Sequence, residues 1–269
     1  MSGSVIHSQS AVMVPAVYSA GQSAQLPVAI DYPAALALRQ MSMVHDELPK
    51  YLLAPEVSAL LHYVPDLRRK MLLATLWNTG ARINEALALT RGDFSLAPPY
   101  PFVQLATLKQ RTEKAARTAG RTPAGQQTHR LVPLSDSWYV SQLQTMVATL
   151  KIPMERRNKR TGRTEKARIW EVTDRTVRTW IGEAVAAAAA DGVTFSVPVT
   201  PHTFRHSYAM HMLYAGIPLK VLQSLMGHKS ISSTEVYTKV FALDVAARHR
   251  VQFSMPESDA VTMLKNRHA

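Results

Sequence analysis

The stretch TPHTFRHSYAMHML, residues 200–213, combines three histidines and one arginine with apolar residues at helical spacing. His202 and Arg205 are three residues apart, so they project from the same side of a helix that starts at or just after Pro201. The first turn of a helix presents unpaired N–H groups and a partial positive charge, which suit a phosphate. The spacing therefore predicts a phosphate-binding pair.

A metal site is the competing interpretation of the same stretch. His206 lies one turn after His202, and His211 follows on the same segment. The pattern HxxxH lacks the glutamate of the HExxH zinc signature, and the arginine between the histidines would repel a divalent cation. A metal-dependent hydrolase using the three histidines stays open as an alternative, and it predicts a loss of activity in a chelator.

Other reactive side chains lie on either side of this stretch. His228 follows a glycine that ends a helical pattern, and Tyr237 comes nine residues later on the next predicted helix. Upstream, Glu85 is three residues after Arg82 and could orient its guanidinium, while Lys109 ends a predicted strand. Taken singly, these residues also fit ordinary structural roles, such as a packing aromatic, a surface ion pair or a solvated lysine.

The elements that would position these residues are mainly helices. Apolar periodicity predicts a helix from about Pro55 to Gly80, another over 81–90, and helices from Trp138 onward, at 173–192, 203–215, 218–226 and 232–250. Two short alternating runs, PFVQLATLK and HRLVPLS, predict strands. The basic segments 110–128 and 151–168 read as loops. The predicted fold class is mostly α with a small antiparallel β-sheet (α+β).

Composition restricts the partner and the compartment. Thirty-one Lys and Arg against nineteen Asp and Glu give a formal charge of +12, which favours nucleic acid over a membrane surface. The absence of cysteine excludes disulfides, thiolate metal sites and cysteine nucleophiles. Because residues 1–30 carry no Lys, Arg, Asp or Glu and no long apolar run occurs, we expect a cytoplasmic protein without membrane contact.

The order of the reactive residues is more specific than any one of them. An arginine, a strand-borne lysine, HxxRH, GHxS and a tyrosine occur in that order, within TGARINEALAL, RLVPL, TPHTFRHSYAMHML and LMGHKSISSTEVYTKV. Over residues 55–241 the chain resembles the tyrosine recombinase (phage integrase) family, and most of all its plasmid-encoded resolvases. The resemblance implies the tyrosine recombinase catalytic domain fold.

The resemblance also implies a chemistry. A tyrosine attacks the scissile phosphodiester of DNA and forms a 3′-phosphotyrosyl bond, and a 5′-hydroxyl later reverses the step. In this reaction two arginines hold the non-bridging oxygens, one histidine handles protons, another donates to the phosphate, and a lysine is the general acid. The implied catalytic residues are Arg82, Lys109, His202, Arg205, His228 and the nucleophile Tyr237, with Glu85 and His206 as structural support. No metal, cofactor or ATP is expected.

The implied partners are double-stranded DNA at a specific recombination site, further copies of the chain in a tetramer on paired sites, and accessory DNA-binding proteins. The implied role is the resolution of plasmid multimers at the bacterial nucleoid or plasmid. Candidate phosphate contacts are Arg111, Lys114, Arg117, Arg121, Arg156, Arg157, Lys159, Arg160, Arg175 and Arg178. A regulator that binds DNA on this scaffold without cleaving it is the alternative function.

The domain organisation departs from the family pattern. Residues 1–50 are poorly periodic, so we expect a flexible N-terminal segment there and no full core-binding domain. Residues 51–269 are expected to form the catalytic domain. After Tyr237, the segment VFALDVAARHRVQFSM offers the apolar residues Val240, Leu243 and Val245 for exchange with a neighbouring subunit.

Overall fold

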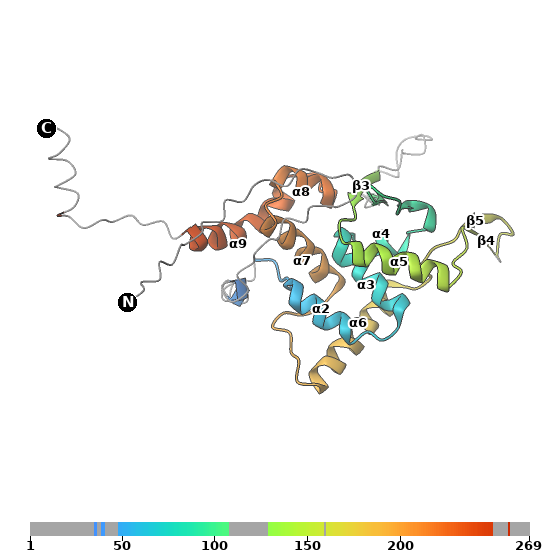
Figure 1. The fold of residues 1–269 in the computed structure, drawn as a ribbon, viewed down its shortest axis with the longest axis horizontal. Helices are drawn as coiled ribbons and strands as arrows, with labels where there is room; N and C mark the ends of the chain where they lie inside the picture. Colours follow the sequence, from blue (N-terminus) through green and yellow to red (C-terminus); the bar gives the residue numbers. More distant parts are fainter. Residues whose placement is uncertain are drawn as a thin grey trace, which may run out of the picture.

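The computed structural model describes residues 35–36, 39–40, 48–107, 129–158, 160–249 and 258 of the chain. Within these ranges the protein is mostly helical with short antiparallel strands (Figure 1), which confirms the predicted fold class. No helix in the described ranges is long and apolar enough to cross a membrane.

Two helices, rather than the single one predicted, precede Gly80. They are α2 (Ala54–His62) and α3 (Leu67–Thr79). The apolar residues stay in phase across both, but Pro65 disfavours helical backbone at the residue before it, so the first helix ends there. Asp66 then caps α3. The break turns the chain so that the two helices pack as separate units.

A short helix, α4 (Ile83–Leu87), and a 3₁₀ turn (Arg91–Asp93) lead into a three-stranded antiparallel sheet. Its strands are β1 (Phe94–Ser95), β2 (Phe102–Ala106) and β3 (His129–Pro133), in the order β1-β2-β3. The pairing of β2 with β3 confirms the two predicted strands. The two-residue β1 is too short to show any alternation in the sequence.

The basic segment 151–168 was predicted to be a loop, but it contains a β-hairpin. After α5 (Ser137–Thr149), the strands β4 (Glu155–Arg157) and β5 (Thr164–Lys166) form an antiparallel hairpin. Asn158 Oδ1 accepts the backbone N–H groups of two residues in its turn, a bonding pattern typical of asparagine. The helix α6 (Asp174–Ala190) follows, and the side chain of Thr173 caps it as predicted.

The last three helices are α7 (Pro201–Tyr214), α8 (Leu219–Met226) and α9 (Ser232–His249). They lie together on one side of the molecule (Figure 1). Gly227 ends α8 in the left-handed conformation, with φ of 63°, so the chain turns sharply between the second and third of these helices.

The core consists of two hydrophobic clusters. The larger one joins α2 to α6 and the three-stranded sheet, and it includes Phe204 of α7. The smaller one joins α7, α8 and α9 with the chain before α2, and it includes Tyr51, Tyr208 and Tyr237. Because α7 contributes to both clusters, it connects the two parts of the core.

Part of the N-terminal segment packs against this core. The described residues 35–36 and 39–40 are helical, and Ala35 and Arg39 are buried. Further along, the N–H of Leu52 donates to Ser207 Oγ at 2.7 Å. The division of the chain at about residue 50 stays a prediction, because most of residues 1–47 lie outside the described part.

Candidate active site

The first turn of α7 presents His202 and Arg205. Thr200 caps the helix by accepting the N–H of Thr203, and Pro201 occupies the first position, where a missing N–H has no cost. His202 is exposed at this end, while Arg205, one turn further, is only 3% exposed. The predicted helix start is therefore correct, but the two side chains differ sharply in their access to solvent.

Arg205 is held by backbone carbonyls from two other elements. Its Nη1 donates to the carbonyl of Gly80, and its Nη2 donates to the carbonyl of Met226 at 2.6 Å. Burial, together with the charge of Arg82, lowers the pKa of Arg205 to about 10, so the guanidinium stays charged at neutral pH. The Arg205 side chain thus connects α7 to the residue that follows α3 and to the last residue of α8.

Arg82 lies at the start of α4 with Glu85 beneath it. The side chain of Arg82 is 42% exposed, whereas that of Glu85 is 0% exposed. Glu85 accepts the N–H of Arg82 at 2.9 Å on one oxygen, and Arg82 Nη1 at 3.0 Å on the other. Glu85 therefore contacts both the backbone and the guanidinium of Arg82.

A third arginine, which the sequence analysis did not select, reaches the same carboxylate. Arg130 on β3 donates from Nη2 to Glu85 Oε2 at 2.6 Å and from Nε to the carbonyl of Leu225 at 2.8 Å. Burial opposes ionisation of Glu85, but the hydrogen bond and charge of Arg130 lower its pKa below the usual value. Arg130 alternates in phase with the buried Val132, and a charge on an inward strand position was the signal available in the sequence.

His228 stands at the turn between α8 and α9. Its Nδ1 is 2.8 Å from Thr234 Oγ1, which is itself buried. Burial, followed by the charges of Arg205, Arg82 and Arg130, lowers the pKa of His228 to about 4. The ring is therefore neutral at pH 7, and it lies within the field of all three arginines.

Tyr237 lies on α9 and is 2% exposed. Its hydroxyl is 2.9 Å from Nδ1 of His206, and the ring of His206 packs edge-on against that of His202 at 4.4 Å between centroids. Burial raises the pKa of Tyr237 to about 12, although the charges of Arg205 and Arg82 act in the opposite direction. The hydrogen-bond partner of the hydroxyl is thus His206, which was predicted only as structural support.

The histidines of α7 do not assemble a metal-ligand set. Burial lowers the pKa of His206 to about 4, and it also lowers those of His202 and His211. His211 packs its ring against Trp77 rather than facing the other two. Among the described residues, no group of three or more His, Cys, Asp or Glu side chains could hold a metal ion.

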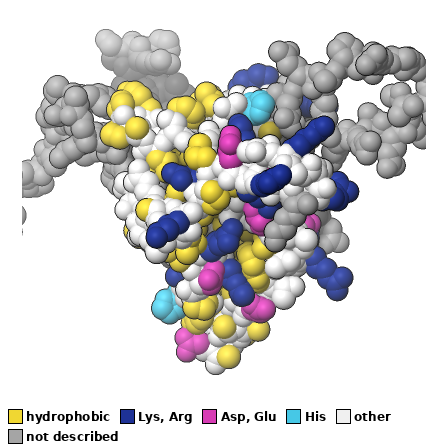
Figure 2. Space-filling view, turned by 90° about the vertical axis from the view of Figure 1, so that its right-hand side faces the viewer, with side chains coloured by type: hydrophobic (Ala, Val, Ile, Leu, Met, Phe, Trp, Pro, Cys, Tyr) yellow, Lys and Arg dark blue, Asp and Glu magenta, His cyan; other side chains and the backbone are white. Residues whose placement is uncertain are grey.

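Five of the basic residues proposed for DNA contact lie in the described part of the chain: Arg156, Arg157, Arg160, Arg175 and Arg178. Figure 2 views the molecule from the side of β4 and β5, and Lys and Arg side chains gather over much of this face. Arg157, Arg160 and Arg175 are exposed, but Arg156 bridges Glu165 and Glu171, and Arg178 pairs with Asp174. Six predicted residues lie outside the described part: Lys109, Arg111, Lys114, Arg117, Arg121 and Lys159.

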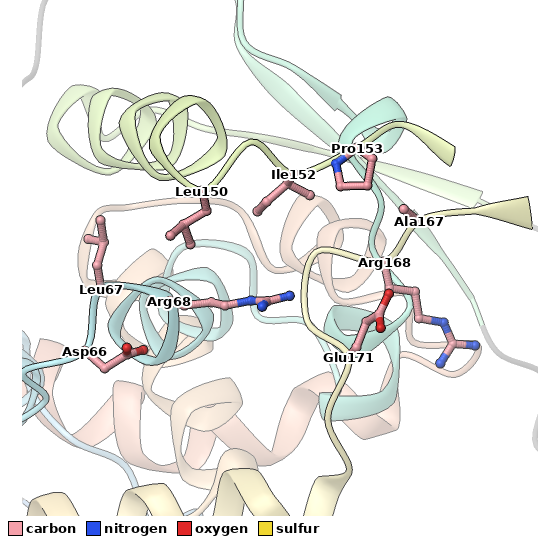
Figure 3. Close-up of a pocket in the computed structure, with 9 residues that line it drawn as sticks. All are labelled: Asp66, Leu67, Arg68, Leu150, Ile152, Pro153, Ala167, Arg168 and Glu171. Carbon is pink, nitrogen blue, oxygen red and sulfur yellow. The ribbon is translucent and has the colours of Figure 1, made fainter. Parts of the chain in front are cut away.

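Two of the surface cavities are lined by described residues. One, of about 410 Å³, lies between the start of α3 and the end of α5, and Figure 3 shows the Arg68 side chain extending across it. None of the predicted catalytic residues lines that cavity. The other, of about 390 Å³, lies between Pro49, Thr200 and Val236 and is lined by His202 and His206. The second cavity is therefore the one adjoining the candidate site.

The fold and the grouped arginines, histidines and tyrosine define the catalytic domain of a tyrosine recombinase. The model of the phage integrase family matches residues 50–243. The chain belongs to this family, and it is a site-specific DNA recombinase.

The similar proteins include a resolvase and a tyrosine recombinase of the Xer type. A resolvase of Escherichia coli K12 is 97% identical over 265 residues, which cover 98% of this chain and 99% of the relative. Tyrosine recombinase XerD of Mycobacterium leprae is 33% identical over 202 residues, which cover 72% of this chain and 57% of that protein.

Among solved structures, the XerH site-specific recombinase bound to palindromic difH substrate in a post-cleavage complex matches with a TM-score of 0.54. The identity is 18%, and the match covers 76% of this chain and 53% of the other, so this chain matches about half of that one. This likeness supports the fold alone.

Proposed function

We propose that this recombinase cleaves and rejoins DNA through a 3′-phosphotyrosyl intermediate on Tyr237, and that it resolves plasmid multimers. The observation that carries the proposal is the grouping of two arginines, Arg82 and Arg205, near both Tyr237 and His228. The charges of both arginines act on the histidine and on the tyrosine. Such a cluster is suited to the two non-bridging oxygens of a phosphodiester, which share one negative charge.

In the proposed cleavage step, the hydroxyl oxygen of Tyr237 bonds to phosphorus while the bond from phosphorus to the 5′ oxygen breaks. The tyrosine proton passes to a histidine, and the 5′ oxygen receives a proton from Lys109. Arg82 and Arg205 stabilise the charge that gathers on the non-bridging oxygens. Rejoining is the reverse reaction with a 5′-hydroxyl of the partner duplex, so the bond energy is conserved and no ATP enters.

Two histidines are candidates for accepting the tyrosine proton. The family resemblance favours His202, whereas the 2.9 Å contact in the structure favours His206 as the immediate partner of the hydroxyl. In both cases the ring is neutral at pH 7, because partial desolvation and the charge of Arg205 lower both pKa values. A neutral imidazole can accept a proton, so this state fits a general base.

We propose double-stranded DNA at a specific site as the substrate, with four copies of the chain on two paired sites and accessory DNA-binding proteins beside them. Recombination between two duplexes breaks four strands, and one nucleophile serves each strand. We also propose that residues 1–50 lack a full core-binding domain, so the basic loops and the β4–β5 hairpin supply much of the DNA affinity through phosphate contacts.

The test begins with footprinting on DNA flanking the gene, to find the protected site. A nicked duplex carrying that site then traps the covalent intermediate, which is detected as protein that migrates with DNA under denaturing conditions. Wild type should form the adduct, and it should do so in EDTA. Tyr237→Phe should bind the duplex with unchanged affinity and form none, because only the attacking oxygen is lost.

Other outcomes identify the alternatives. If wild type binds the footprinted site but forms no adduct on any nicked version of it, the protein is a regulator that binds DNA without cleaving it. If EDTA abolishes the adduct and added divalent metal restores it, the metal-dependent interpretation of the histidines returns. Either result removes the proposed mechanism.

A further inference from the structure

Arg130 occupies a position where a charge has a large cost. It lies on β3 in phase with Val132, and its side chain is 7% exposed. A buried guanidinium needs hydrogen-bond partners to offset the loss of water. Arg130 finds them on two elements, in Glu85 at the start of α4 and in the carbonyl of Leu225 near the end of α8. Its Nη1 has no hydrogen-bond partner among the described residues.

The Glu85 carboxylate is the centre of this arrangement. It is fully buried, and it accepts from the backbone N–H of Arg82, from Arg82 Nη1 and from Arg130 Nη2. A phosphate held by Arg82 must compete with this carboxylate for the same guanidinium. If Arg82 turned away and no other cation were present, a buried carboxylate would keep only one backbone donor, which is strongly unfavourable.

We infer that Arg130 is a positioning residue for cleavage: as the standing counter-ion of Glu85, it frees Arg82 to turn to the scissile phosphate. Arg82 is suited to such a movement because its side chain is 42% exposed, while Arg130 is enclosed. The inference rests on the proposed function of Arg82, and it adds to the reaction a residue that touches neither the phosphate nor the nucleophile.

The same guanidinium also holds the turn that carries His228. Arg130 donates to the carbonyl of Leu225 and Arg205 donates to that of Met226, so two arginines cap consecutive carbonyls at the end of α8. A Cβ atom at Gly227 would lie 3.0 Å from both Cδ and Nη1 of Arg130. The guanidinium therefore packs against the glycine backbone, and this contact keeps the side chain turned toward Glu85.

The test compares Arg130→Met, Arg130→Lys, Glu85→Gln and the double variant Arg130→Met/Glu85→Gln. Single-turnover adduct formation is measured on the nicked duplex with saturating protein, and the dissociation constant of the same duplex is measured separately. Arg130→Met should slow adduct formation by about tenfold or more, because Glu85 then retains Arg82. Its dissociation constant should change by less than about threefold, since most phosphate contacts remain.

The double variant distinguishes a counter-ion from a merely structural arginine. Without the carboxylate charge, Arg82 is free again, so the double variant should form adduct about as fast as Glu85→Gln and several times faster than Arg130→Met. Arg130→Lys keeps the charge, so its rate of adduct formation should lie between those of wild type and Arg130→Met. A control, Arg39→Met, removes another buried guanidinium paired with a carboxylate. It should lower the melting temperature and leave the adduct rate per folded molecule unchanged.

The inference is overturned if Arg130→Met forms adduct at the wild-type rate. It is also overturned if the variant only binds the duplex more weakly and forms adduct at the wild-type rate once protein is saturating. It is also overturned if the double variant is as slow as Arg130→Met. If Arg130→Met does not fold, the double variant is compared with Glu85→Gln instead. Adduct formation by the double variant that is tenfold slower than by Glu85→Gln then contradicts the inference. If wild type forms no adduct, the proposed function fails, which is a separate result.

Discussion

Tyr237 retains its proton in the folded protein at neutral pH. Burial raises its pKa to about 12, and its hydroxyl is hydrogen-bonded to His206. The nearby arginines oppose the shift without cancelling it. An ionised Tyr237 is therefore rare in the protein alone. In the proposed reaction, attack at neutral pH needs a neighbouring base and a phosphate held by the arginines.

The half-buried His206, which contacts Tyr237, should make stability depend on pH. Burial, with the charges of His202 and Arg205, lowers the pKa of His206 to about 4, against 6.5 for an ordinary histidine. Between these two values the unfolded chain binds a proton that the folded chain does not. Above about pH 6.5, His206 therefore does not change the free energy of unfolding. As the pH drops from 6.5 to 4, this histidine lowers the free energy of unfolding.

We predict that His206→Gln removes this part of the acid sensitivity. Between pH 7.5 and pH 4.5, wild type should lose on the order of 2 kcal/mol more free energy of unfolding than the variant. Urea unfolding at both pH values measures the difference. His228 titrates in the same direction but is present in both proteins, so its contribution cancels. Equal losses in the two proteins would mean that His206 is protonated as easily when folded as when unfolded.

Gly80 is required by its backbone and by its neighbour. Its φ is 59°, and a Cβ atom built there would lie 2.3 Å from the ring of Tyr208. We predict that Gly80→Ala costs about 3 kcal/mol or more of stability and slows adduct formation, because the Gly80 carbonyl holds Arg205.

The matched control is Gly192→Ala. Gly192 has a φ of 80°, but a Cβ atom there would meet no described atom within 4 Å. Only the backbone strain applies, so the loss should be about 1 kcal/mol. Urea melts of both variants give the comparison. Equal losses would show that the contact with Tyr208 adds nothing.

At the scale of elements, the sequence predicts what short-range patterns encode. The helices α6 and α8 carry a cap or a terminal glycine and an apolar face, so their positions could be predicted closely. The break between α2 and α3 was missed because the apolar period continues through Pro65. The hairpin of β4 and β5 was missed because its strands are short and polar, and its turn depends on Asn158 rather than on an apolar pattern.

The β4–β5 hairpin contains exposed arginines and one arginine that is paired with carboxylates. We predict that the triple variant Arg157→Ala, Arg160→Ala, Arg163→Ala weakens DNA binding and flattens the dependence of log Kd on log salt, because each phosphate contact contributes to that slope. Arg156→Ala should leave the slope nearly unchanged, since Arg156 is bound to Glu165 and Glu171. Binding isotherms at several salt concentrations measure both. An unchanged slope in the triple variant would show that the exposed arginines are merely solvated.

At the scale of the whole molecule, the site is assembled across long sequence separations, and this limits what a pattern can reveal. Arg82, Arg205, His228 and Tyr237 could be selected because their order resembles a family. The contact of Tyr237 with His206 joins two helices, and the contact of Arg130 with Glu85 joins a strand to a helix. Neither follows from periodicity, because packing of the two core clusters determines both.

Assembly on paired sites provides a test at this scale. Leu243 lies on the C-terminal part of α9, in the segment expected to pass to a neighbouring subunit. We predict that Leu243→Asp keeps the affinity for a single site within about threefold but lowers recombination between two sites tenfold or more, because a charge is unfavourable in an apolar contact. Gel shifts with one and two sites, together with a recombination assay, measure this. Full recombination by the variant would place the exchange contact elsewhere.

The two carbonyls that hold Arg205 have a consequence for conformational entropy. A free arginine side chain carries about 2 kcal/mol of rotamer entropy, and fixing it normally has that cost at the moment of binding. The Gly80 and Met226 carbonyls orient Arg205 as the chain folds, so a phosphate meets a guanidinium that is already in place. The half-exposed Arg82 still has freedom to lose. In the proposed reaction, Arg205 therefore defines where the phosphate lies, and Arg82 closes upon it.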